Sequence, residues 1–158
     1  MTMKRLFYLA ALLILCVSCG KDPNDEWSRF FGFTKTDIVG HYEANPDPSV
    51  YPELPTEGVV VYDNATVEVI DLSDNLVSFR LVIPETLNKV FTGAVPTDGS
   101  SSDLGFHNNH EDVLLTVYKN GKGQVRFHGR YRYYYSDKGG PEDADIYGFD
   151  VIKTEIQQ

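Results

Sequence analysis

Short runs of β-branched and aromatic residues, separated by turn-forming residues, follow one another along most of the chain. These runs cover residues 37–44, 58–62, 65–72, 76–83, 89–94, 113–119, 124–135 and 144–153. Asp63-Asn64 and the Ser-Asp-Asn triplet at 73–75 separate three of them, and residues of these types favour tight turns. Each run is therefore predicted to form a β-strand.

The residues after the apolar N-terminal segment show no helical periodicity. No window of about 11 residues there repeats apolar residues at the spacing of a core-facing helix. Only residues 27–33 are predicted to form a short helical turn, and the polar stretch 95–112 is predicted to be a loop. The pattern predicts an all-β fold, an antiparallel meander of seven or eight strands. Such a meander closes into a barrel or, alternatively, packs as a β-sandwich.

The run 124–135 alternates between apolar and polar residues, most of them basic. Successive side chains of a strand point to opposite faces of the sheet. One face carries Val125, Phe127, Gly129, Tyr131, Tyr133 and Tyr135, and the other carries Arg126, His128, Arg130, Arg132 and Tyr134. Burying several guanidinium groups together is costly, so the apolar face should point inward. We expect Phe127, Tyr131 and Phe149 in the core, and Arg126, Arg130 and Arg132 on the opposite side.

The same alternation predicts how the last three strands pair. A three-residue turn at 119–121, with Gly121 in the left-handed conformation, brings apolar faces together across the first pair. The predicted partners are Leu115 with Val125, Val113 with Phe127, Tyr133 with Tyr147, Tyr131 with Phe149, and Arg130 with Asp150. The last of these pairs joins opposite charges.

Residues 37–43 (DIVGHYE) resemble the Leu-x-Gly-x-Trp opening of lipocalin-like barrels. Gly40 holds the glycine position, and Tyr42 stands where tryptophan is usual. The resemblance implies a barrel around a ligand cavity. If the basic face lined that cavity, Arg130, Arg132 and Tyr134 would resemble the site that holds a carboxylate in fatty-acid-binding barrels. Arg126 and His128 would lie beside that site; the alternative is a solvent-exposed face balanced by acidic neighbours.

The N-terminus has the pattern of an export signal. Lys4 and Arg5 precede 12 uncharged and mostly apolar residues at 6–17. This length fits the apolar core of a signal peptide and is too short to cross a bilayer as a helix. The segment is therefore expected to be cleaved.

The residues that follow resemble the bacterial lipobox, in which a small residue precedes an obligate cysteine. Residues 15–19 read LCVSC, and a glycine follows. The resemblance implies cleavage after Ser18 and lipidation of Cys19, which anchors the protein in a membrane. Cys16, the other cysteine, would place a bulky leucine at the cleavage position and is the less suitable alternative.

A polar, proline-containing stretch at 20–26 (GKDPNDE) is predicted to be a tether. Its acidic residues resemble the export tag that sends some Gram-negative lipoproteins to the outer face of the outer membrane. We therefore expect a signal peptide over 1–18, a lipidated cysteine and tether over 19–26, and a single β-domain over 27–158. The domain is expected at the cell surface rather than on the periplasmic face.

Composition narrows the choice of partners. Cleavage after Ser18 leaves 140 of the 158 residues and removes Lys4 and Arg5, so the net charge moves from −9 to −11. A chain this acidic is not expected to bind nucleic acid or an anionic membrane surface. Cys19 would be the only cysteine of the cleaved chain, so no internal disulfide can form. The domain is expected to be a monomer.

Residues 107–112 (HNNHED) place two of the four histidines beside two carboxylates. Imidazole and carboxylate groups bind transition metals, so His107, His110 and Glu111 form a candidate metal site; the alternative is a polar turn before a strand. The sequence has no Gly-x-Ser-x-Gly elbow and no phosphate-binding glycine loop. No catalytic residue or cofactor is assigned, and a non-enzymatic role is expected.

Two functions fit these observations. The first is a non-catalytic interaction or structural module at the cell surface that contacts a glycan or a protein through exposed tyrosines. The second is a lipocalin-like binder of a small anionic or lipidic ligand. An interior cavity of about 300 Å³ or more would favour the second function, and a solid core would favour the first.

Overall fold

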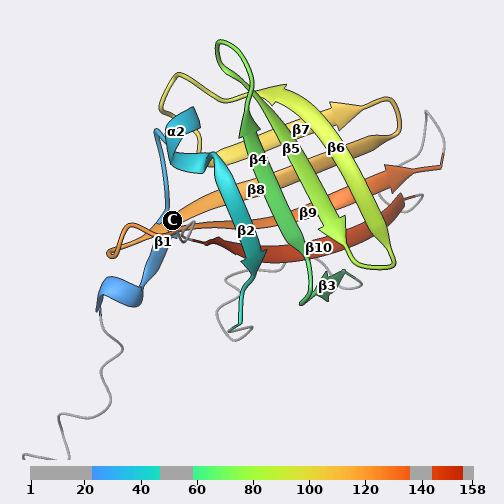
Figure 1. Ribbon diagram of the computed structural model, residues 1–158, viewed down its shortest axis with the longest axis horizontal. Helices are drawn as coiled ribbons and strands as arrows, with labels where there is room; N and C mark the ends of the chain where they lie inside the picture. Colours follow the sequence, from blue (N-terminus) through green and yellow to red (C-terminus); the bar gives the residue numbers. More distant parts are fainter. Residues whose placement is uncertain (1–22, 47–58, 136–143, 155–158) are drawn as a thin grey trace, which may run out of the picture.

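The structure is a computed structural model that describes residues 23–46, 59–135 and 144–154 (Figure 1). These residues form an all-β fold with two short helical segments, η1 (Pro23–Asp25) and α2 (Lys35–Ile38). The strands are β1 (Trp27–Arg29), β2 (Gly40–Ala44), β3 (Val60–Tyr62), β4 (Thr66–Asp71), β5 (Leu76–Ile83), β6 (Leu87–Ala94), β7 (Asp103–Asn108), β8 (Glu111–Asn120), β9 (Val125–Tyr134) and β10 (Ala144–Lys153). The predicted all-β class is confirmed.

The strands form one sheet that bends into two crossing layers (Figure 1). One layer contains β2, β4, β5 and β6, and the other contains β7, β8, β9 and β10. Neighbouring strands within each layer pair antiparallel. Antiparallel pairing of β10 with β2 joins the layers on one side. Two three-residue strands complete the sheet: β1 pairs with the end of β8, and β3 runs parallel to β10.

The sheet does not close into a barrel, because β6 and β7 do not pair in the part of the chain that the structure describes. Gly93 of β6 lies against Phe106 of β7, and a Cβ at Gly93 would lie 2.7 Å from Cδ1 of that ring. An aromatic side chain thus occupies the contact between the two strands, and Lys89 of β6 forms an ion pair with Glu111 of β8 on this side. The expected closed lipocalin-like barrel is wrong, and the fold agrees with the alternative of two packed layers.

The space between the layers is filled by aromatic rings. Phe79 of β5 has its ring centroid 4.8 Å from that of Phe106 and 6.4 Å from those of Phe127 and Phe149. Tyr42 stacks on Phe127 at 4.1 Å, and its buried hydroxyl donates a 2.6 Å hydrogen bond to the carbonyl of Ile38. The interior of the fold is therefore a packed core.

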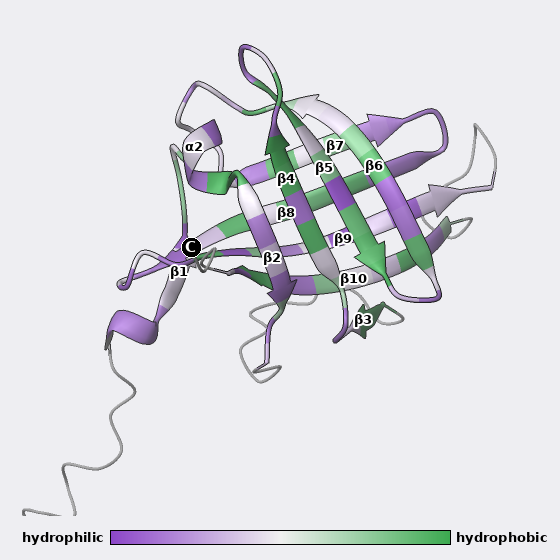
Figure 2. Ribbon diagram, viewed as in Figure 1, coloured by the Kyte–Doolittle hydropathy of each residue, from purple (hydrophilic) through white to green (hydrophobic). Residues whose placement is uncertain are grey.

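Alternating hydropathy along the strands builds this core. In β5, every second residue from Val77 to Ile83 is buried, and the residues between them are exposed or half-buried. Figure 2 shows that hydrophobic residues predominate along β4 and β5 and are interrupted by hydrophilic ones. Phe127, Tyr131 and Phe149 are buried in the core, as predicted.

Most strand predictions agree with the structure, since β5 and β10 have the predicted bounds and β9 differs by one residue at each end. Two predictions at the N-terminus are wrong. Trp27–Arg29 forms a strand rather than a helical turn, because it pairs with the end of β8. The first two residues of the predicted strand 37–44 belong to α2, where the Asp37 carboxylate accepts hydrogen bonds of 2.8 and 2.6 Å from the backbone N–H and the hydroxyl of Thr34. This capping box favours a helical turn.

Strand β7 lies within the predicted loop 95–112, so that prediction is also wrong. Its sequence is polar and contains glycine, but pairing with β8 places Leu104 and Phe106 in the core. Together with β1, this strand brings the number of strands among the described residues to ten, above the seven or eight predicted.

The predicted register of the last strands is also wrong, although the assignment of faces is right. The turn after β8 spans Asn120–Gln124, and Gly123 rather than Gly121 adopts a positive φ, +83°. The observed partners are Leu115 with Gly129, Val113 with Tyr131, Tyr131 with Tyr147, Gly129 with Phe149, and His128 with Asp150. The shifts are four and two residues, and an even shift keeps every side chain on its own face.

Candidate functional site

The five polar residues of β9 lie on the outer face of the sheet, opposite the core residues Phe127 and Tyr131. This outer basic face comprises Arg126, His128, Arg130, Arg132 and Tyr134. The sequence predicted this side of the strand correctly. It did not predict that Arg126 would be fully buried, with 0% of its surface exposed.

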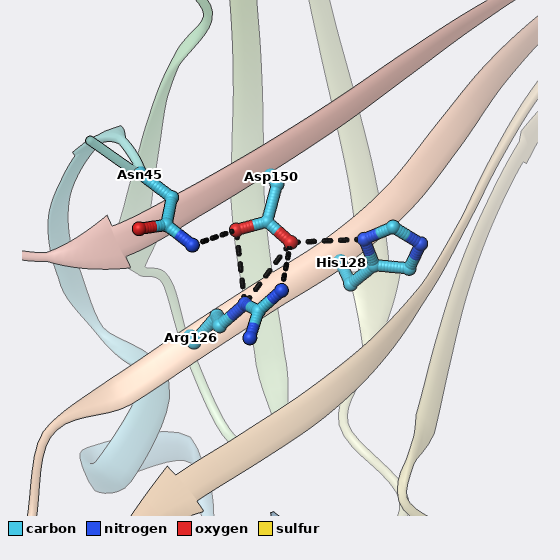
Figure 3. A network of polar contacts seen from close by, with 4 residues as sticks. All are labelled: Asn45, Arg126, His128 and Asp150. Carbon is cyan, nitrogen blue, oxygen red and sulfur yellow. Dashed lines mark hydrogen bonds and ion pairs between the residues drawn. The ribbon is translucent and has the colours of Figure 1, made fainter. Parts of the chain in front are cut away.

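Asp150 of β10 is the centre of a buried polar network on that face (Figure 3). Arg126 donates from Nε to both carboxylate oxygens, at 2.9 and 3.0 Å, and from NH2 to Oδ2 at 2.5 Å. The Nδ2 of Asn45 donates to Oδ1 at 2.9 Å, and the Nδ1 of His128 lies 2.9 Å from Oδ2. The Asp150 side chain is fully buried, so its charge is balanced by the guanidinium rather than by water.

Aromatic rings cover the guanidinium of Arg126. Its Cζ lies 5.6 Å from the ring centroids of both Trp27 and Tyr118, a distance at which a cation is attracted to the face of an aromatic ring. Trp27 is positioned by the pairing of β1 with β8. The short N-terminal strand therefore helps to close the network from solvent.

A second ion pair lies further along the same face. Arg132 of β9 donates to Asp112 of β8 from Nε at 2.8 Å and from NH2 at 2.5 Å. Tyr134 donates from its hydroxyl to the same carboxylate at 2.9 Å. Hydrogen bonding to Asp112, together with burial, raises the pKa of Tyr134, and burial is the larger cause.

The outer basic face therefore does not form the interior carboxylate site that the lipocalin resemblance implied. Arg126 and Arg132 already have protein carboxylates as partners, and aromatic rings fill the interior. Two of the surface hollows formed by the described residues, of about 710 and 240 Å³, lie elsewhere, and none of the five residues lines either one.

The larger hollow lies at the turn between β7 and β8. It has a volume of about 710 Å³, is open to solvent, and is lined by His107, Asn108, Asn109, His110, Glu111 and Tyr133. Residues 107–111 come from the hairpin itself, where His107 pairs with Asp112 and Asn108 pairs with Glu111. Tyr133 reaches the hollow because it lies opposite Glu111 in the pairing of β8 with β9.

The structure brings the three candidate metal ligands, His107, His110 and Glu111, to this one hollow. Among the residues that the structure describes, however, no group of three or more His, Cys, Asp or Glu side chains is arranged to hold a metal ion. The metal site at these three residues therefore stays a prediction that the geometry does not support.

Glu111 is held at the edge of the hollow by Lys89 of β6. Lys89 donates a hydrogen bond to the Glu111 carboxylate. Burial alone would raise the pKa of Glu111, but the interactions with Lys89, and weaker ones with Tyr131 and Asn108, outweigh burial and lower it. Conversely, burial and the nearby Glu111 carboxylate raise the pKa of Tyr131. Glu111 is thus a fixed, ionised acceptor at the edge of the hollow.

Tyrosines gather beside the hollow. Tyr133 and Tyr135 have ring centroids 5.7 Å apart and nearly perpendicular planes, at 82°, and are 37% and 64% exposed. The ring of Tyr147 lies 5.7 Å from that of Tyr131 and 5.8 Å from that of Tyr62. The alternation along 131–135 places Tyr131, Tyr133 and Tyr135 on one face, but their position beside the β7–β8 hairpin does not follow from the sequence.

Comparison of the chain with protein-family models, with curated proteins and with solved structures found no match. Within the described residues, no helix has the length and apolar character needed to cross a membrane. The predicted signal peptide 1–18 and Cys19 lie outside the described residues.

Proposed function

We propose that this chain is an exported lipoprotein, anchored at the cell surface through Cys19, whose β-domain is a non-catalytic interaction module. The role as an interaction module is supported by the filled interior of the domain. Phe79, Phe127 and Phe149 pack between the layers, and this packing supports binding of a ligand on the outer surface. Binding of a lipid inside the fold is not favoured by this packing.

The anchor is supported by the sequence. An apolar run at 6–17 precedes Ser18-Cys19-Gly20, and the polar tether 20–26 separates the cysteine from the domain. The first described element, η1, begins at Pro23. The tether would therefore leave only a few residues between a lipid anchor and the folded domain, which would hold the domain close to the membrane.

A paired cysteine experiment tests this proposal in intact Gram-negative cells. Wild type should fractionate with membranes, incorporate radiolabelled palmitate, and be digested by protease added to intact cells. Cys19→Ser should lose the label and remain as the uncleaved precursor. Cys16→Ser is the matched control and should behave as wild type, since Cys16 is predicted to leave with the signal peptide. Labelling that depends on Cys16, or palmitate label and normal processing retained by Cys19→Ser, would contradict the predicted anchor.

A further inference from the structure

We propose that the hollow at the β7–β8 turn binds a neutral saccharide. The inference rests on the proposed surface function and deepens it by naming the class of ligand. This site, the hairpin hollow, consists of the six residues that line it, His107, Asn108, Asn109, His110, Glu111 and Tyr133.

The polar groups of the hairpin hollow match those of a sugar. Each sugar hydroxyl both donates and accepts hydrogen bonds, so its binding site needs donors and acceptors close together. The Asn108 and Asn109 amides supply both, the His107 imidazole supplies one or both according to its protonation, and the Glu111 carboxylate accepts. Five of the six lining residues are of this kind, which suits a ligand that carries several hydroxyls.

The aromatic groups match the other face of a sugar. A pyranose ring has apolar C–H faces, and an exposed tyrosine can cover such a face while its hydroxyl stays in water. Tyr133 lines the hollow, and the more exposed Tyr135 stands beside it with its ring nearly perpendicular. The two rings present two differently oriented apolar surfaces next to the polar groups.

The hairpin hollow is also held in place before any ligand binds. Lys89 of β6 donates a hydrogen bond to the Glu111 carboxylate, and Asn108 and Glu111 are paired across the hairpin. Groups that are already fixed lose less conformational entropy on binding. This matters for sugars, because each hydroxyl must exchange a hydrogen bond to water for one to protein, and the net gain is small.

Other ligand classes fit the hollow less well. An anionic ligand would meet the ionised Glu111 on a chain of net charge −9, and a lipid tail would stay largely in water because the hollow is open to solvent. A protein interface has an apolar centre that is depleted in charge, with polar groups at its rim, whereas this hollow is lined mainly by polar side chains. A neutral saccharide satisfies both the polar lining and the adjacent rings.

Affinity electrophoresis of the full-length, detergent-solubilised protein tests the proposal. The probes are xylan, glucomannan and mixed-linkage β-glucan as neutral polysaccharides, with polygalacturonate as the anionic comparison. Migration of wild type should be retarded by at least one neutral polysaccharide and not by polygalacturonate. Tyr133→Ala and Asn109→Ala should each weaken that retardation by about tenfold, which corresponds to the loss of a contact of about 1.4 kcal/mol.

Two controls keep the result interpretable. Phe31→Ala removes an exposed aromatic ring, 57% exposed, that does not line the hollow, and it should bind as wild type does. Asn109 is an exposed turn residue with no positive φ, so its replacement should leave the fold intact even if Tyr133→Ala is less stable. Circular dichroism checks the folding of each variant.

Three results would overturn the saccharide site. They are no retardation by any neutral polysaccharide, retardation that survives both Tyr133→Ala and Asn109→Ala, and retardation by polygalacturonate alone. Each is distinct from failure of the proposed surface function, because anchoring and protease accessibility are measured on cells without a ligand.

Discussion

The environment of Arg126 in the fold differs from the one that its sequence position predicts. In an alternating strand it has the pattern of a solvated base, yet its guanidinium is fully buried against Asp150 and between two aromatic rings. A buried ion pair adds little net stability, since desolvation offsets the attraction, but removal of one partner leaves an uncompensated charge. The two residues of the pair therefore depend on each other: loss of either one would destabilise the fold.

Asp150→Asn is expected to lower the free energy of unfolding by about 3–5 kcal/mol, because it leaves the Arg126 guanidinium buried without its counter-charge. Urea denaturation measures this change. Asp71→Asn is the matched control: it removes a carboxylate that is about half-exposed and paired with Lys35, and it should cost less than about 1 kcal/mol. Equal effects of the two substitutions would contradict the assigned role of the buried network.

At the scale of the strands, a glycine selects the register of β9 between its neighbours. Gly129 lies opposite Leu115 of β8 and Phe149 of β10. A Cβ at Gly129 would lie 2.7 Å from the Cβ of Leu115 and 2.8 Å from the Cζ of Phe149. The absence of a side chain makes room for two larger ones, which a register shifted by two or four residues would not match.

Gly129→Ala is therefore expected to destabilise the fold by about 1–3 kcal/mol or more, since core overpacking forces backbone shifts. The measurement is the midpoint of thermal or urea unfolding. Gly105→Ala in β7 is the control, because the nearest atom to its added methyl group would lie at 3.5 Å, an ordinary contact. If Gly129→Ala were as stable as wild type, the proposed effect of this glycine on register would be wrong.

For the molecule as a whole, the open side between β6 and β7 is the place where the two layers are held by side chains rather than by strand pairing. The Lys89–Glu111 ion pair and the Gly93–Phe106 contact lie there. The Lys89–Glu111 ion pair responds to pH, because Glu111 has a lowered pKa in the folded protein. Its contribution to stability is present above its ordinary pKa, 4.5, and is lost as the pH falls through the folded-state pKa.

Glu111→Gln is accordingly expected to cost about 0.2–1 kcal/mol at neutral pH, the range for a partly exposed ion pair. It should also reduce the loss of stability that wild type shows on acidification below about pH 4.5. Urea titrations at several pH values, compared with Glu68→Gln on the outer face of β4, measure both effects. An acid dependence identical to that of wild type would show that Glu111 does not contribute to it.

The sequence by itself determined the all-β class, most strand bounds, and the side on which each residue of β9 lies, because these follow from local alternation between apolar and polar residues. It could not determine register, since an even shift preserves the alternation, and the registers differ in tertiary fit, as around Gly129. It could not predict β7, whose polar residues become a strand through pairing with β8. Three further features depend on residues that are distant in the chain: the burial of Arg126, the open side between β6 and β7, and the position of Tyr133 beside the β7–β8 hairpin. The sequence could not predict them, because only tertiary packing brings such residues together.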